Sequence, residues 1–282
     1  MHKTGSTSIQ HFFSRRRWIL PYFGIFYPDS TGPDGRRQPK HNAIFTAVSH
    51  EADFGAPHPA LGPSADLIEA LADQIERRRA STCVLSAEGF SGEKPEFADA
   101  FAPLADRFDI SVVVFLRRPD IWLEKFHRQM IMGRDTRERR GIEAFANAAD
   151  TRRHLDYFGV LDWWARAFGA DALKIAPYDE NVDAMPRFLD AASLPRRIYQ
   201  SALMRSRKNP SPSPDVVLAT LRENRDGEAV GEGDIRLAPQ AKLELVSRLE
   251  MAWRRRLSPE FDGVAPPPFI FSMLADARRE IE

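Results

Sequence analysis

The chain has 282 residues, 43% of them hydrophobic, which is enough for one large core or two smaller ones. Its 40 basic side chains balance 40 acidic ones, so no overall field attracts nucleic acid, and any anion site must be local. The single cysteine, Cys83, lies in an apolar run and excludes a disulfide framework. The longest mostly apolar stretch, 18–27, is too short to span a membrane, and no signal peptide precedes it. We therefore expect a cytoplasmic protein without a membrane segment.

Apolar spacing in the first two thirds of the chain predicts strands alternating with helices. Ser64 is placed to cap one of these helices, and Pro119 stands at the first position of another, where its missing N–H costs nothing. The clearest buried strand is 110–116. The predicted elements, in chain order, are a helix at 5–16, a strand at 24–28, a loop at 29–40, a helix after it, a helix at 65–79, a strand at 82–86, a helix at 95–107, a strand at 110–116, a helix from Pro119, a helix at 153–168 and a strand at 172–176.

The last third is predicted to be mainly helical, with helices at 181–192, 213–223 and 237–255. Strands that alternate with helices favour an α/β fold, in which helices cover both faces of a mostly parallel sheet. We expect a single domain over 1–282, with a core at about 1–200 and a helical C-terminal extension at about 201–282. Ligands of such sheets bind beyond the carboxyl ends of the strands.

The start of the chain, residues 2–8, combines a lysine, a glycine and several hydroxyl side chains at the mouth of the first helix. Gly5 permits a tight turn, the amide N–H groups converge on an anion, and the helix dipole adds partial positive charge. Lys3 contributes a full charge. In nucleotide triphosphatase loops the lysine follows the second glycine, whereas here it precedes a single glycine.

A second basic group, Arg117 and Arg118, follows the strand 110–116. A guanidinium at a strand end can bind a phosphate in bidentate fashion. The two motifs, in this order, resemble those of the P-loop sulfotransferases of bacterial type, which use 3′-phosphoadenosine 5′-phosphosulfate (PAPS). The resemblance covers about residues 1–200 and includes the stretches Tyr27-Pro28…His41 and Trp163…Tyr178.

The resemblance implies which residues hold the nucleotide. It assigns the 5′-phosphate and the sulfate to the loop formed by Lys3, Thr4, Gly5, Ser6 and Thr7, with Lys3 stabilising the leaving oxygen. It assigns the 3′-phosphate to the arginine that ends the buried strand.

Arg117 aligns best with that arginine. Lys125 stands eight residues later, where the family has a serine, and it could contact the 3′-phosphate as a point charge. Arg205 and Lys208 lie in a basic, turn-prone segment that resembles the loop closing over the nucleotide, although an inter-helix linker explains that segment equally well.

The acceptor hydroxyl also needs a base. Glu88 follows the strand 82–86, where the family often places its base, and partial burial would raise the pKa of its carboxyl group. His41, at the start of a predicted helix, is the rival candidate because the pKa of an imidazole lies near neutrality. Histidine spacing suggests no metal site, and sulfuryl transfer requires no metal because the group carries less charge than a phosphoryl group.

The implied fold is a three-layer sandwich whose first central strand would precede the loop at Lys3, so we expect the native protein to extend upstream. The implied acceptor is a carbohydrate or glycolipid, recognised by 29–64, 133–150 and the C-terminal third. The alternatives are an impaired or truncated sulfotransferase-like nucleotide-binding protein and, with less support, a P-loop kinase. No nucleic-acid partner is expected, and the oligomeric state stays open. The arginine triplets 15–17 and 77–79 lie at helix ends, where the dipole favours cations, and receive no function.

Overall fold

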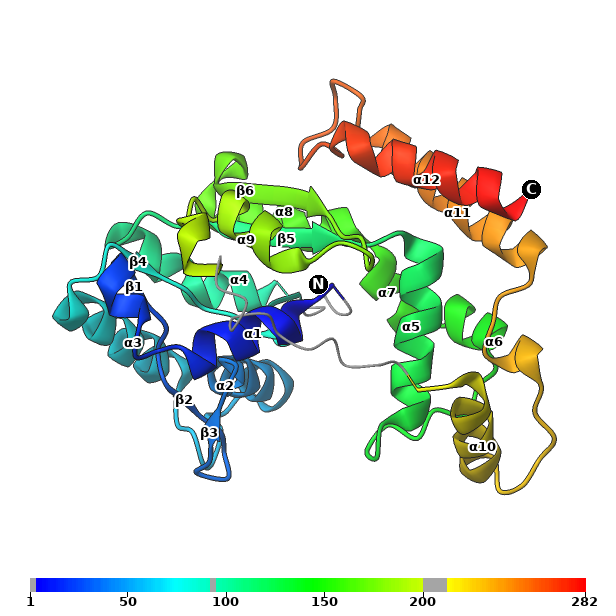
Figure 1. Cartoon of the computed structure of the whole chain (residues 1–282), viewed down its shortest axis with the longest axis horizontal. Coiled ribbons are helices and arrows are strands. Elements are labelled where there is room, and N and C mark those ends of the chain that lie inside the picture. Colours follow the sequence, from blue (N-terminus) through cyan, green and yellow to red (C-terminus); the bar gives the residue numbers. More distant parts are fainter. Residues whose placement is uncertain (1–3, 92–94, 200–211) are drawn as a thin grey trace. The chain divides into compact units, whose positions relative to one another are not determined.

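A computed structural model describes residues 4–91, 95–199 and 212–282 (Figure 1). These residues form two compact units. Unit 1 comprises the described residues of Met1–Phe115 and Gly159–Lys208, and unit 2 comprises those of Leu116–Phe158 and Asn209–Glu282. Leu116–Phe158 thus groups with Asn209–Glu282.

Unit 1 mixes short strands with α-helices and 3₁₀ helices (η). Two elements, β5 and α8, cross its boundary with unit 2. In chain order its elements are α1 (Ser6–Arg15), η1 (Leu20–Phe23), β1 (Ile25–Phe26), β2 (Ser30–Thr31), β3 (Arg37–Gln38), α2 (Asn42–Phe54), α3 (Ser64–Arg78), β4 (Thr82–Cys83), η2 (Glu88–Ser91), α4 (Glu96–Phe101), η3 (Ala102–Asp106), β5 (Val112–Leu116), α8 (Tyr157–Phe168), η4 (Ala170–Ala172), β6 (Leu173–Pro177), α9 (Ala184–Ala191) and η5 (Arg196–Tyr199).

The strands of unit 1 pair in twos. β1 and β4 are parallel, with Ile25 opposite Thr82 and Phe26 opposite Cys83, whereas β2 and β3 form an antiparallel hairpin within the predicted loop 29–40. β5 lies beside β6. The prediction of a mixed α/β chain with strands between helices is thereby confirmed.

β4 is shorter than the predicted strand 82–86, and the hydrogen bonds of Ser86 supply the reason. The Ser86 N–H donates to Nδ1 of His41, 3.0 Å away, and the Ser86 carbonyl accepts the His41 N–H at 2.9 Å. Because both backbone groups of Ser86 bond to the start of α2, they are not available to a neighbouring strand.

Burial in unit 1 follows the predicted helix faces. Ile9, Phe12 and Phe13 of α1 are at most 4% exposed, and they pack in one core cluster with residues of β1 and α9. A second cluster joins α2, α3, α4 and α8. Each fully buried side chain of this size contributes roughly 1.5–3 kcal/mol through removal from water, so the two clusters fix the helices around the strands.

The described residues of unit 2 form helices. α11 packs on α12, α10 packs on α5, and the buried Trp253 of α11 stacks on Tyr157. The predicted helix 153–168 is divided at Asp156 into α7 and α8. None of the helices in the described residues is both long and apolar enough to cross a membrane. The elements of unit 2 are α5 (Pro119–Met132), α6 (Ile142–Asn147), α7 (Ala149–Leu155), α10 (Pro214–Asn224), η7 (Glu232–Asp234), α11 (Pro239–Arg255) and α12 (Pro268–Ile281).

Candidate functional site

The loop that precedes α1 turns at Gly5, whose backbone is left-handed with φ of 75°. A Cβ at this position would lie 3.0 Å from Cε2 of Tyr178 and 3.1 Å from the Cβ of Ala184. Glycine is therefore required twice, by the backbone angle and by the lack of space for a side chain. The turn lies against the residue that follows β6 and the first residue of α9.

The turn leads directly into a helix that begins with hydroxyl side chains. Thr4 is buried, Ser6 and Thr7 stand in the first turn of α1, and the Gly5 carbonyl accepts the N–H of Ser8 at 3.1 Å. The N–H of Ser8 is thus engaged within the turn, and the helix dipole makes this end of α1 favourable for an anion. Lys3 lies outside the described residues.

His41 is buried, 4% exposed, and its ring nitrogens contact backbone groups. Nδ1 accepts the N–H of Ser86, so the ring proton is on Nε2, which lies 3.1 Å from the carbonyl oxygen of Pro28 and donates to it. The aromatic ring of Tyr27 lies edge-on at 4.6 Å between centroids. The lone pair that a general base would use is therefore engaged with Ser86.

Burial lowers the pKa of His41 to about 4, since removal from water disfavours the imidazolium more than the backbone contacts of Pro28 and Ser86 favour it. A neutral imidazole at neutral pH, with both nitrogens bonded to the backbone, fits a structural role at the start of α2. It does not fit the role of a solvent-exchanging base.

The backbone that carries Glu88 is held against α2. Glu88 begins η2, and a Cβ on the next residue, Gly89, would lie 2.3 Å from the ring of Phe45. Farther along, the indole N–H of Trp164 donates to the Phe90 carbonyl at 3.1 Å. The side chain of Glu88 is outside the described part of the chain, so its role as base stays a prediction.

Asn42, the first residue of α2, is a polar residue near this segment that the sequence motifs did not single out. Its Oδ1 is buried and has no hydrogen-bond partner among the described residues. A buried acceptor of this kind is rarely left without a partner in a folded protein. No sequence signal distinguishes it, because its burial depends on neighbours from other segments.

In unit 2, Arg117 directly follows β5, as predicted for an arginine at a strand end. It is 6% exposed, and its carbonyl accepts the hydroxyl of the buried Tyr157 at 3.1 Å. This contact fixes the backbone that carries the guanidinium.

The neighbouring Arg118 is bound in another way. Its Nε and Nη2 donate to the two carboxylate oxygens of the buried Asp120 at 2.9 and 3.1 Å, and its Nη1 contacts Glu280 at 2.5 Å. A bidentate carboxylate pair occupies most of the donors of Arg118. The role of Arg117 toward a phosphate stays a prediction.

Lys125 stands in the middle of α5, two turns beyond Arg117. Arg205 and Lys208 lie outside the described residues. The predicted site therefore divides between the units: Thr4 to Thr7, His41 and the backbone of Glu88 belong to unit 1, whereas Arg117 and Lys125 belong to unit 2. The meeting of the two halves stays a prediction.

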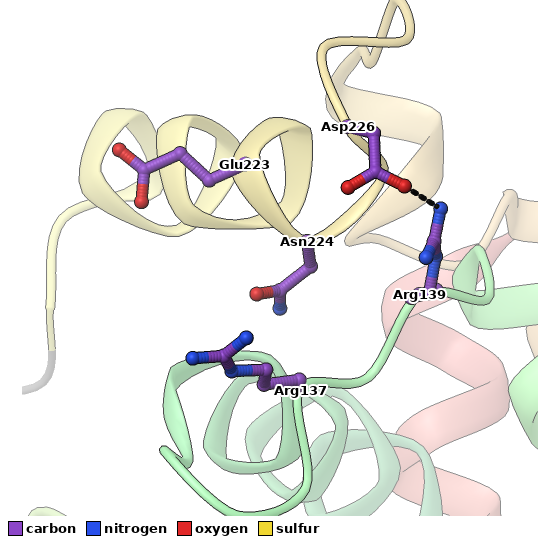
Figure 2. A pocket seen from close by; sticks show the side chains of 5 residues that line it. All are labelled: Arg137, Arg139, Glu223, Asn224 and Asp226. Atoms are coloured by element: carbon purple, nitrogen blue, oxygen red, sulfur yellow. Dashed lines mark hydrogen bonds and ion pairs between the residues drawn. The ribbon is translucent and has the colours of Figure 1, made fainter.

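Unit 2 also holds a polar cavity of about 340 Å³ that the sequence motifs did not indicate (Figure 2). Arg139 pairs with Asp226 across it at 2.7 Å. Its lining side chains come from the segment after α5 and from the end of α10: Arg137, Arg139, Glu223, Asn224 and Asp226.

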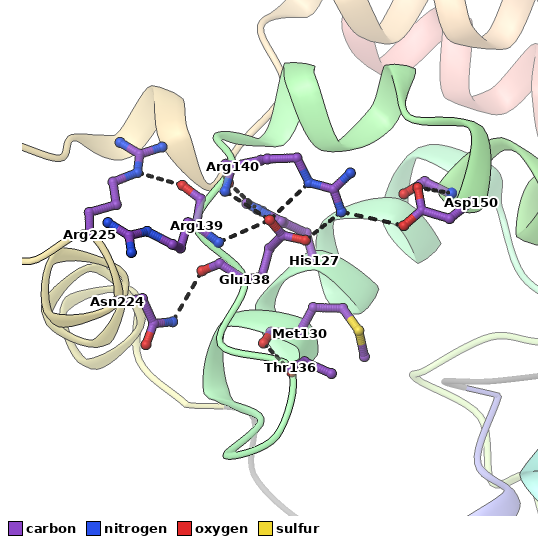
Figure 3. A network of polar contacts seen from close by, with 10 residues as sticks. His127, Met130, Thr136, Glu138, Arg139, Arg140, Asp150, Asn224 and Arg225 are labelled. Atoms are coloured by element: carbon purple, nitrogen blue, oxygen red, sulfur yellow. Dashed lines mark hydrogen bonds and ion pairs between the residues drawn. The ribbon is translucent and has the colours of Figure 1, made fainter.

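The same segment is fixed by charges that bind one another (Figure 3). The carboxylate of Glu138 accepts from the backbone N–H groups of Arg139 and Arg140 and from the guanidinium of Arg140. The amide of Asn224 donates to the Glu138 carbonyl at 3.1 Å. These contacts tie the segment to α10, so the dense charge here has a structural use.

No known family model matches the chain, and neither the curated proteins nor the solved structures contain a match to it. Among residues 4–91, 95–199 and 212–282, no three His, Cys, Asp or Glu side chains gather closely enough to hold a metal ion.

Proposed function

We propose that this chain is a PAPS-dependent sulfotransferase that transfers a sulfuryl group to an acceptor hydroxyl, with a carbohydrate or glycolipid as the acceptor. The observation that carries the proposal is the turn at Gly5. Its left-handed backbone is wedged against Tyr178 and Ala184, and it presents the hydroxyl-bearing first turn of α1 beside the end of β6. That arrangement suits a 5′-phosphosulfate, which binds to N–H and hydroxyl donors that approach it closely. The absence of a side chain at Gly5 allows the backbone to come close.

The 3′-phosphate is assigned to Arg117. Two observations support this assignment. The guanidinium of Arg118 is bound to Asp120 and Glu280. The backbone of Arg117 is anchored at the end of β5 by the hydroxyl of Tyr157. Lys125 adds charge in the same unit. Arg205 and Lys208 complete the nucleotide site in this proposal.

The base is assigned to Glu88, because the His41 lone pair is engaged with Ser86 and the pKa of that imidazole is low. In this mechanism the oxygen of the acceptor hydroxyl attacks sulfur, and the Glu88 carboxylate takes the proton of that hydroxyl. The bond from sulfur to the 5′-phosphate oxygen breaks in line, and Lys3 stabilises the charge that develops there. The products are the sulfated acceptor and adenosine 3′,5′-bisphosphate.

The finer fold belongs to the same proposal: a three-layer sandwich around a mostly parallel sheet. So does a cytoplasmic location. The supporting fold observations are the parallel pair β1–β4 and the order of strands and helices through unit 1.

The direct test is transfer of radiolabelled sulfate from PAPS to a panel of glycans and glycolipids. We expect Lys3→Ala to abolish transfer and Glu88→Gln to reduce it by about 10²–10⁴-fold. Lys174→Ala is a matched control, since that ammonium, carried by β6, donates to the carbonyl of Asp171 in η4 at 2.9 Å. Full turnover of the Lys3→Ala protein would contradict the assignment of the loop.

The two neighbouring arginines offer a second test. Arg117→Lys should weaken binding of adenosine 3′,5′-bisphosphate by about tenfold, because an ammonium cannot form the bidentate contact. Arg118→Lys should leave the Kd unchanged and instead lower the free energy of unfolding. Binding of the bisphosphate without any sulfate transfer would favour the impaired, nucleotide-binding alternative.

A further inference from the structure

Two large aromatic side chains stand in solvent at one place in unit 1. Trp18 is 70% exposed and Tyr22, four residues later in η1, is 84% exposed. The backbone between them is held by short-range turns, with the N–H of Ile19 on the Arg16 carbonyl and the N–H of Tyr22 on the Ile19 carbonyl. Two exposed aromatic side chains on an ordered turn form a surface with large apolar rings, each of which also carries one polar group.

Four exposed arginines belong to segments next to these aromatics in the sequence or in the fold. Arg15, Arg78, Arg79 and Arg197 are all exposed, and none of them forms an ion pair within the described residues. Nearby carboxylates are engaged elsewhere: Glu76 of α3 binds Arg107, and Asp190 of α9 binds Arg196. The surface therefore carries uncompensated positive charge.

Hydrogen bonds and ring contacts bring these segments to one place. The Gly24 carbonyl, directly after η1, accepts the N–H of Thr82 and the hydroxyl of Ser81, which follow the end of α3. This joins η1 to the turn that carries Arg78 and Arg79, next to β1 and β4 (Figure 1).

From the other side, the guanidinium of Arg197 lies 5.5 Å from the ring centre of Phe23, and that of Arg78 lies 5.6 Å from the ring of Phe26. Arg15 stands three residues before Trp18 at the end of α1. We call the set Trp18, Tyr22, Arg15, Arg78, Arg79 and Arg197 the aromatic–basic surface.

We propose that the aromatic–basic surface docks unit 1 on an anionic lipid bilayer. Trp and Tyr are the residues that settle at the boundary between headgroups and acyl chains, where one end of the ring is apolar and the other wet. Arginines beside them meet the phosphates of anionic headgroups. An acidic protein partner would satisfy the charge, but it gives no reason for the exposure of both aromatic rings. The inference is independent of the sulfotransferase proposal.

The test is co-sedimentation of the full chain with vesicles of phosphatidylcholine alone or mixed with phosphatidylglycerol. We expect binding only to the mixed vesicles and weaker binding at high salt. Arg15→Gln with Arg79→Gln should weaken it about thirtyfold, since each arginine near an anionic surface contributes about fivefold. Trp18→Ala with Tyr22→Ala should weaken it at least about tenfold.

Matched controls are available in unit 1. Phe54→Ala removes an aromatic side chain of similar exposure, 73%, at the end of α2, and Arg166→Gln removes an exposed arginine of α8. Neither should change sedimentation. Brominated lipid in the vesicles should quench tryptophan fluorescence, and Trp18→Ala should remove most of this quenching, since Trp122, Trp164 and Trp253 are buried and Trp163 is partly buried.

Two outcomes would overturn the proposal. The first is absence of binding to mixed vesicles by a chain whose folding is verified by circular dichroism. The second is binding that survives both double substitutions, or that the Phe54→Ala and Arg166→Gln controls weaken as much. Capture of an acidic protein with no vesicle binding would assign the surface to a protein partner instead.

Discussion

The loop at Gly5 is the proposed anion site, whereas the segment 133–141 is richer in arginine, and the structure builds the two in opposite ways. The segment 133–141 contains four arginines, and two of them contact carboxylates of the same unit: Arg140 binds Glu138 and Asp150, and Arg139 binds Asp226. The described part of the loop, Thr4 to Thr7, has no charged side chain. Its form is set by a left-handed glycine and by contact with Tyr178.

The difference shows that charge density is a poor guide to a binding site. Charged side chains that pair within the fold stabilise a segment. A ligand that binds one of them must displace its partner, which leaves the displaced charge without its pair. Backbone N–H groups at a helix start keep their capacity for an external anion.

The largest effect is expected for Gly5→Ala. The new Cβ would meet Tyr178 and Ala184 and would force a left-handed alanine, so the free energy of unfolding should fall by about 3 kcal/mol. Affinity for adenosine 3′,5′-bisphosphate should fall as well. Urea unfolding and calorimetric titration measure the two effects.

Gly35→Ala is the matched control, because Gly35 has φ of 72° and an added methyl group would meet no atom within 4 Å. It should cost only the backbone term, about 1–2 kcal/mol, with no change in nucleotide binding. Equal losses at both glycines would remove the close contact from the account.

Acid should destabilise unit 1 through His41. Burial lowers the pKa of His41 to about 4 from an ordinary 6.5, so the unfolded chain binds more protons between these values. The stabilisation is complete above pH 6.5 and is lost as the pH falls from 6.5 towards 4, which gives about 2 kcal/mol lost by pH 5. Urea unfolding at a series of pH values measures it.

Desolvation also lowers the pKa of the buried His127 in unit 2, so His127 too makes the protein less stable in acid. The variant His41→Gln separates the contribution of His41 to this pH dependence from that of His127. We expect a smaller slope of stability against pH in His41→Gln than in the natural protein. Gln74→Ala, at an exposed position of α3 that carries no titratable group, serves as the control and should leave the slope unchanged. An identical slope in all three proteins would contradict the geometry given for the imidazole.

The smallest effects are expected in the segment 133–141. Glu138→Gln removes the carboxylate shared by Arg139 and Arg140 and should cost about 1.5 kcal/mol of unfolding free energy. Asp226→Asn breaks an exposed pair with Arg139 and should cost less than about 0.5 kcal/mol.

Neither variant should alter the Kd for adenosine 3′,5′-bisphosphate. A change in that Kd as large as the one at Gly5 would show that the paired segment takes part in binding the nucleotide.

Local pattern predicted much of unit 1. The helix at 65–79 is α3, with bounds Ser64–Arg78, and Pro119 opens α5 as expected. These elements depend on apolar spacing and on the missing N–H of proline, which neighbouring residues decide.

Long-range contacts were beyond prediction. Ser64 was expected to cap α3, but its N–H and hydroxyl bind the carboxylate of Glu51 from α2, and Pro63 precedes the helix. The helix α12 was not predicted, because the run of three prolines at 266–268 indicates a turn. In the structure the last of these prolines is the first residue of the helix.

The same limit applies to the candidate site. The motif predicted a tight turn at Gly5. It did not predict the close contact of this turn with Tyr178, which lies 173 positions later in the sequence. Nor could the sequence reveal that His41 meets Ser86, since that pairing follows from how α2 and β4 pack. Local chemistry indicated the groups, and packing decided that His41 is buried and bonded to the backbone.

The most direct test of the central claim is the stability of the full chain with adenosine 3′,5′-bisphosphate and, separately, with ATP and Mg²⁺. At a hundredfold excess over its Kd, the bisphosphate should raise the free energy of unfolding by about 2.7 kcal/mol, because it binds only the folded state. ATP with Mg²⁺ should give no comparable rise, and Lys3→Ala should remove the effect of the bisphosphate. A folded chain that responds to ATP with Mg²⁺ but not to the bisphosphate would contradict the account.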